Sequence, residues 1–153
     1  RGMIASVKSE DELAAVLARQ KRDPWAVARD VAVLERWVAR PDWTDTLTAY
    51  ARCARIVRGQ TVEADALVAS ELEDGPERDL WAALERHLAA AGSADAEALL
   101  GALTELAPHI HRFFDAVLVM AEEPSVRARR LALVDRVARL PERVADLSLL
   151  EGF

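Results

Sequence analysis

The sequence is poor in the features that hold secreted or membrane proteins together. Cys53 is the only cysteine among 153 residues, so no internal disulfide can form and a disulfide scaffold is excluded. No apolar run approaches the roughly 20 residues that a membrane span needs. The chain also does not begin with a charged leader followed by a hydrophobic stretch. We therefore expect a cytoplasmic protein with no membrane partner.

Residues that favour β-strands are scarce as well. Ile, Tyr and Phe together number 7, whereas Ala (30) and Leu (20) make up about a third of the chain. Alanine and leucine are among the strongest helix formers, and no long alternation of apolar and polar residues argues for a strand. The composition predicts an all-α fold. The short connections favour a compact antiparallel bundle of about six to seven helices.

Capping residues and breakers divide the chain. Asp23 before Pro24 predicts a helix start, as does Gly75 before Pro76, and Gly59 predicts a helix end. A capping box at residues 9–12 predicts the first helix, with residues 1–8 a flexible remnant of a longer chain before one helical domain, residues 9–153. The expected helices span about 9–20, 24–40, 42–58, 76–91, 93–106, 108–117 and 126–140, with a further possible helix at 62–72.

Charge is distributed unevenly along the chain. The net charge is +3 over residues 1–58, −9 over residues 59–108 and 0 over residues 109–153. Of the 20 cationic residues, 18 are arginine, which grips phosphate bidentately and stacks on bases. Two arginine-rich segments can therefore bind RNA, with the acidic middle facing away from it. Abundant arginine on solvated faces is the alternative interpretation.

Patterns of catalytic residues are missing from the sequence. It has no glycine-rich phosphate loop, no nucleophile elbow and no cysteine pair at metal-binding spacing. His109 and His111 are two residues apart and so face different sides of a helix, which makes them, with His87, a poor metal set. The four tryptophans could stack on bases, but their positions near apolar stripes favour core packing. We expect neither a catalytic residue nor a metal site.

One arginine lies where an apolar residue is expected. On a helical wheel Arg130 falls inside the stripe of the last long helix, and a guanidinium buried there needs a partner. The preceding helix offers Asp115 as its only acid. We therefore predict that Arg130 or Arg52 forms a buried or half-buried ion pair with Asp115, either as a clamp between helices or as a direct ligand contact.

Arginines also recur every three residues at Arg52, Arg55 and Arg58. They drift around the surface of one helix beside its apolar stripe. Such a ridge can follow the phosphates of a nucleic acid. It can equally be a solvated edge, and the sequence does not separate these two interpretations.

The C-terminal half resembles a known family. Residues 113–133 are similar to a run written FFDxVMVMAEDxxLRxNRLALL, and residues 144–150 to a following VADxSLL. Upstream, residues 49–57 resemble its AFKRVANIL segment and residues 41–43 its PDF. These patterns resemble the C-terminal anticodon-binding domain of the β subunit of bacterial glycyl-tRNA synthetase, which is related to the helical anticodon domains of the arginyl and cysteinyl enzymes.

This resemblance implies a function. A domain of this kind binds the anticodon stem and loop of tRNA-Gly while a separate α subunit carries out ATP-dependent glycylation, with magnesium, in an α2β2 ligase. The domain itself would be non-catalytic and hold no cofactor. Its partners would be tRNA-Gly, the rest of the β subunit and the α subunit, and not DNA.

The match also indicates positions for that function. It falls on Arg52, Asp115, Arg127, Arg130 and Asp146. The chain departs from the family at four places, with arginine for asparagine twice, alanine for a basic residue and proline for phenylalanine, at Arg55, Arg129, Ala51 and Pro141.

The alternative function is a helical protein-docking module that does not bind RNA.

The site prediction assigns these side chains two roles, one structural and one in RNA binding. We expect the pair Arg130 and Asp115 to be structural, and the RNA-facing set to be Arg52, Arg55, Arg127 and Arg129.

Overall fold

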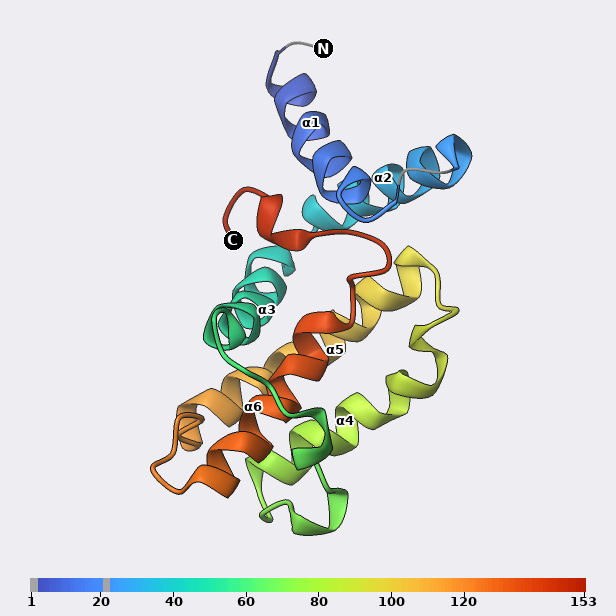
Figure 1. Ribbon diagram of the computed structural model, residues 1–153. Coiled ribbons are helices and arrows are strands. Elements are labelled where there is room, and N and C mark those ends of the chain that lie inside the picture. Colours follow the sequence, from blue (N-terminus) through green and yellow to red (C-terminus); the bar gives the residue numbers. More distant parts are fainter. Residues whose placement is uncertain (1–2, 21–22) are drawn as a thin grey trace.

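The protein is a bundle of helices, shown in Figure 1 as a computed structural model that describes residues 3–20 and 23–153. This part of the chain contains no strand, so the all-α prediction is confirmed. Three single turns of 3-10 helix, η1 (Ala64–Ala66), η2 (Ala69–Glu71) and η3 (Leu147–Leu149), accompany the α-helices. The six α-helices are α1 (Met3–Leu17), α2 (Pro24–Val38), α3 (Trp43–Val57), α4 (Pro76–Ala91), α5 (Ala96–Ala116) and α6 (Pro124–Arg139).

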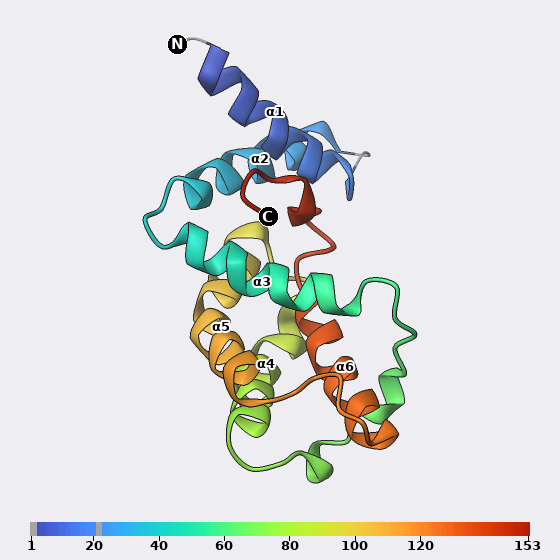
Figure 2. The same cartoon turned by 90° about the vertical axis from the view of Figure 1, so that its left-hand side faces the viewer.

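Helix α5 lies at the centre of the bundle. It packs against α4, α3 and α2, while α3 also packs along α6 (Figure 2). The pair α1 and α2 forms one end of the molecule, with the C-terminal segment lying against it (Figure 1). Because α5 stands between α3 and α4, the arginine-bearing helix and the helix of the acidic middle segment pack on it from different sides.

The continuity of α5 corrects two predicted boundaries. Pro108 was expected to begin a new helix, but it lies inside α5. The buried stripe of Leu106, Ile110 and Phe113 runs past the proline, and this packing outweighs the single backbone hydrogen bond that proline cannot donate. The predicted cap at Ser93 is also wrong, because the side chain of Asp95 caps α5 by accepting from the N–H of Ala98 at 2.8 Å.

Other helix starts and ends follow the sequence signals. Asp23 caps α2, its carboxylate accepting from the N–H of Trp25 at 3.0 Å, with Pro24 as the first helical residue. Helix α3 ends at Val57, and Gly59 then takes φ +78°, a left-handed conformation that glycine adopts without a Cβ clash. These boundaries confirm the predicted second and third helices.

The segment 62–72, for which a helix was considered possible, is not an α-helix. It forms the two short turns η1 and η2 instead. In this segment Val68 stays exposed and Leu67 is half-buried. A helix here would therefore lack the apolar stripe whose burial stabilises most helices in proteins.

Helix α1 differs most from its prediction. It begins at Met3 and not at Ser9, so part of the segment 1–8 is helical, while Arg1 and Gly2 lie outside the described residues. The C-terminal segment holds its far end. The N–H of Asp146 donates to the carbonyl of Ala15 at 2.9 Å, and the Gln20 amide donates to the carbonyl of Val144 at 3.0 Å.

Candidate nucleic-acid interface

Arg52 is held on the flank of α3 that packs against α5. One of its guanidinium nitrogens lies 3.4 Å from Oδ1 of Asp115, and another lies 3.1 Å from Nδ1 of His111. The other ring nitrogen of His111 lies 3.1 Å from Asp45. The predicted ion pair between Arg52 and Asp115 is present, but the expectation that it would be buried or half-buried is wrong, since Asp115 is 70% exposed.

Arg55 and Arg58 lie on the same helix, facing the C-terminal residue. The guanidinium of Arg55 is 5.0 Å from the ring centre of Phe153 and also donates to its carbonyl oxygen, and that of Arg58 lies at 6.0 Å from the same ring. Both arginines are exposed. Neither has an Asp or Glu partner among the described residues, so the charge of each is left for a phosphate, which on Arg55 would compete with the Phe153 oxygen. We call Arg52, Arg55 and Arg58 the α3 ridge.

Arg127 stands at the start of α6. Its guanidinium donates to the carbonyl oxygens of Ala121 at 2.8 Å and Glu122 at 3.3 Å, in the connection between α5 and α6. A hollow of about 550 Å³ opens beside it, lined also by residues 59–61. Arg52 and Arg127, far apart in sequence, are thus both fixed to one stretch, residues 111–122. A backbone carbonyl does not neutralise Arg127, which keeps its charge for a ligand.

Arg129 has a different role from the predicted one. Its side chain is 10% exposed, and its Nε donates to Oε2 of Glu77 at 2.9 Å. An arginine enclosed in this way is neutralised and inaccessible to a phosphate. The prediction that Arg129 faces RNA is therefore wrong, and it belongs to the interior of the bundle.

Arg130 also binds a partner other than the predicted Asp115. Its Nε donates to Oε1 of the same Glu77 at 2.9 Å, and Nη2 to Glu73 at 2.7 Å. The position of Arg130 in an apolar stripe correctly indicated that it needed an acid. Glu77 was not considered as this acid because it lies in the acidic segment 59–108, which was expected only to face away from RNA, yet its side chain is only 1% exposed.

The buried carboxylate of Glu77 has a lowered pKa. Burial alone would raise the pKa of this carboxyl, but hydrogen bonds from Arg130, the N–H of Glu73 and Arg129 outweigh that effect and hold the pKa of Glu77 below its ordinary value. The group is therefore ionised at neutral pH. Together, Glu77, Arg129 and Arg130 form what we call the Glu77 clamp, which ties the start of α4 to α6.

A second group of arginines was assigned no role by the sequence analysis. Arg136, Arg139 and Arg143 stand near the end of α6. Arg136 and Arg139 are three residues apart on one face of α6, and Arg143 follows in the turn after the helix. The recurrence of arginine at these three positions is the signal that could have indicated them. Here they border a hollow of about 590 Å³.

The tryptophans divide between core and surface. Trp37 and Trp43 are buried, and the indole N–H of Trp37 donates to Glu97 at 2.7 Å. Trp25 is 85% exposed at the start of α2. Core packing, which the sequence favoured, therefore describes the first two and not Trp25.

The described residues contain no group of three or more His, Cys, Asp and Glu side chains placed to hold a metal ion. Among the helices of this same part, none combines the length and the apolar character needed to cross a membrane.

Comparison with known proteins points to one family. The profile of the DALR anticodon binding domain matches residues 46–147, from α3 to η3. The chain is 36% identical, over 99% of its length, to a "Glycine--tRNA ligase beta subunit" of Anaeromyxobacter sp. (strain K), of which it covers 23%. It is 34% identical, over 93% of its length, to the protein of that name from Acidithiobacillus ferrooxidans, of which it covers 21%.

A plant protein is similar as well. The chain is 33% identical, over 95% of its length, to a "Glycine--tRNA ligase, chloroplastic/mitochondrial 2" of Arabidopsis thaliana, of which it covers 14%. The chain thus spans less than a quarter of the length of each of these relatives.

Proposed function

The chain belongs to the DALR anticodon-binding domain family, and we propose that it binds the anticodon stem and loop of tRNA-Gly as part of a glycyl-tRNA synthetase β subunit. One observation carries this proposal: the matched segment 46–147 contains the α3 ridge and Arg127 together. The names of the similar proteins support glycine as the amino acid.

The chemistry of the exposed arginines suits a single-stranded RNA loop. Bases in such a loop are unstacked and can be read by stacking and by hydrogen bonds to their edges, while phosphates are bound by guanidinium groups. Arg55 and Arg58 have no carboxylate partner among the described residues, and Arg127 is held only by carbonyl oxygens. These three side chains supply the positive charge, and Arg52, whose charge Asp115 balances, adds hydrogen-bond donors.

The parent enzyme supplies the chemistry in this proposal. Glycylation would take place on other parts of an α2β2 assembly in the cytoplasm, with ATP and magnesium bound there. This chain would contribute RNA binding and contacts to the rest of the β subunit. It would hold the tRNA in register for a distant reaction centre.

Gel retardation tests the proposal directly. The protein should retain tRNA-Gly more strongly than an unrelated tRNA of equal length, since a ligand recognised through its loop is bound selectively. Equal retention of both would leave only nonspecific charge binding. No retention of either would favour a protein-docking module and overturn the proposal.

Substitutions then locate the interface. Arg55→Ala should weaken tRNA-Gly binding by about tenfold, the cost of one charge-assisted hydrogen bond. Arg86→Ala is the matched control, because Arg86 is an exposed arginine on the acidic helix α4 and should change binding less than twofold. If both substitutions have the same effect, the α3 ridge is not the binding surface.

A further inference from the structure

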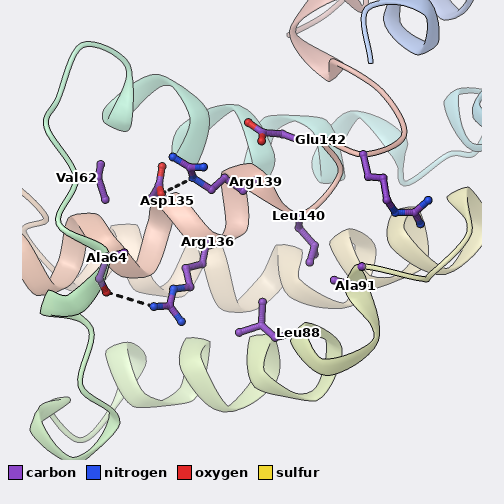
Figure 3. A pocket seen from close by; sticks show the side chains of 11 residues that line it. Val62, Ala64, Leu88, Ala91, Asp135, Arg136, Arg139, Leu140 and Glu142 are labelled. Carbon is purple, nitrogen blue, oxygen red and sulfur yellow. Dashed lines mark hydrogen bonds and ion pairs between the residues drawn. The ribbon is translucent and has the colours of Figure 1, made fainter. Parts of the chain in front are cut away.

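The hollow of about 590 Å³ lies between the C-terminal halves of α4 and α6 and the segment that follows α3 (Figure 3). Its volume falls within the roughly 300–1,000 Å³ of typical small-molecule sites. We call it the α4–α6 pocket. Apolar side chains from three elements line one part of it: Val62, Leu88, Ala91 and Leu140.

Charged side chains line the rest of the pocket. Arg139 is paired with Asp135, its Nε lying 2.7 Å from Oδ2, so that these two charges cancel. Arg136 donates only to the carbonyl of Ala64, at 3.3 Å, as the dashed line in Figure 3 marks. Arg143 is exposed and makes no hydrogen bond or ion pair with the described part of the chain. With Glu142 as the second acid, the lining carries a net charge of +1.

This combination selects one class of ligand. An apolar surface suits the face of a planar ring, and a net charge of +1 balances a single phosphodiester. A free nucleoside triphosphate would bring several negative charges against this one, close to the carboxylates of Asp135 and Glu142. One nucleotide within an RNA strand fits both the shape and the charge.

The pocket is also connected to the α3 ridge. A second hollow, of about 280 Å³, shares Asp135, Arg139 and Glu142 with it and extends to Arg58 at the end of α3. The Asp135–Arg139 ion pair therefore stands between two adjoining hollows. An RNA strand that follows the ridge reaches the pocket across this ion pair.

We propose that the α4–α6 pocket holds one unstacked nucleotide of the RNA loop, its base against Leu88 and Leu140 and its phosphate on Arg136 and Arg143. This inference rests on the proposed function and adds to it the place of a single base. It also gives a role to Arg136 and Arg139 near the end of α6 and to Arg143 in the turn that follows.

The test uses an RNA hairpin with the anticodon stem and loop of a tRNA-Gly, and a series in which each loop nucleotide in turn lacks its base. Arg143→Ala should weaken binding of the intact hairpin by about tenfold, because the bound phosphate would lose the guanidinium of Arg143. Arg86→Ala, which removes an exposed arginine outside the pocket, should weaken it less than twofold.

Leu88→Trp fills the pocket without changing its charge. One abasic position should weaken binding to the unsubstituted protein by about tenfold, and the Leu88→Trp variant should bind the intact and that abasic hairpin equally. Circular dichroism checks that each variant is folded. Arg143 is exposed, so its substitution keeps the test decisive if Leu88→Trp does not fold.

The outcomes separate the two proposals. If the unsubstituted protein binds the hairpin while Arg143→Ala and all abasic positions leave affinity unchanged, the pocket assignment is overturned and the proposed function stands. If the unsubstituted protein does not bind the hairpin, both fail. Tenfold losses in both the Arg143→Ala variant and one abasic hairpin support the pocket.

Discussion

At the scale of single residues, Glu77 is the group on which the arginines of α6 converge. A carboxylate that is 1% exposed costs several kcal/mol to desolvate. Arg129 and Arg130 offset that cost by donating to its two oxygens. The three side chains therefore act as one unit, and removing any one of them leaves a buried charge without its partner.

Glu77→Gln should lower the free energy of unfolding at neutral pH by about 3 kcal/mol, since an amide cannot balance two guanidinium charges. Urea unfolding followed by circular dichroism measures the loss. The control is Asp74→Asn, which removes a carboxylate that is 92% exposed and paired with Arg78. It should cost less than about 1 kcal/mol. Equal losses of unfolding free energy in both variants would show that the buried ion pairs of Glu77 contribute no more to stability than an exposed ion pair.

The same clamp predicts a dependence on pH. The pKa of Glu77 is lower in the folded protein than its ordinary value of 4.5, because the effect of burial is outweighed by hydrogen bonds from Arg130, the N–H of Glu73 and Arg129. Its stabilising contribution is therefore complete above about pH 4.5 and is lost as the pH falls through the folded-state pKa. The stability difference between the unsubstituted protein and Glu77→Gln should be constant from neutral pH to about pH 5 and shrink in more acidic urea titrations. A constant difference throughout would contradict this.

The sequence indicated that Arg130 needs an acidic partner, but it did not identify Glu77 as that partner. The wheel position of Arg130 correctly required an acid. The choice of Asp115 failed because that residue lies on a helix whose end is solvent-exposed, while Glu77 approaches α6 from a helix that is distant in sequence. Such a pairing depends on tertiary packing, which local spacing does not encode.

At the scale of elements, α5 shows how packing overrides a local signal. It is continuous through Pro108 because the residues on either side bury one stripe. The helices that start at Asp23–Pro24 and at Gly75–Pro76 were predictable because their caps act locally. The conformation of segment 62–72 was not predictable, because it depends on how much of the segment's apolar surface the neighbouring helices bury.

Pro108→Ala should stabilise the protein by about 1–3 kcal/mol, because alanine restores the N–H that α5 lacks at this exposed position. Thermal unfolding measures the gain. Pro124→Ala is the control, since Pro124 lies in the first turn of α6, where its N–H has no helical partner. It should give no comparable gain. A loss of stability in Pro108→Ala would show that the bundle requires the bend at the proline.

At the scale of the whole molecule, charge is distributed unevenly over the surface as well as along the sequence. The formal charge of −6 hides accessible arginines on α3 and α6 and a segment, residues 59–108, with a net charge of −9. Helix α4, which belongs to that segment, packs on α5. Total charge therefore says little about RNA affinity here. The distribution of charge along the chain predicted this asymmetry. It did not predict which arginines stay accessible, because that depends on the ion pairs formed inside the bundle.

Binding to tRNA-Gly should weaken steeply between about 50 and 200 mM salt, because each phosphate contact releases counterions. Arg55→Ala should reduce the slope of log Kd against log salt concentration by about 1, and the buried Arg129 should contribute nothing to that slope. Fluorescence anisotropy with labelled RNA gives both slopes. A salt-independent affinity would rule out phosphate contacts on this face.

The hydrogen bonds from residues 144–146 to Ala15 and Gln20 have a consequence for the order of folding. The bond from the Gln20 side chain joins residues 124 positions apart, and the bond from Asp146 to Ala15 joins a similarly distant pair. Contacts between residues so far apart in the chain cost more loop-closure entropy than contacts between neighbouring helices. We therefore expect α1 to pack on α2 first and on the C-terminal segment in a later step.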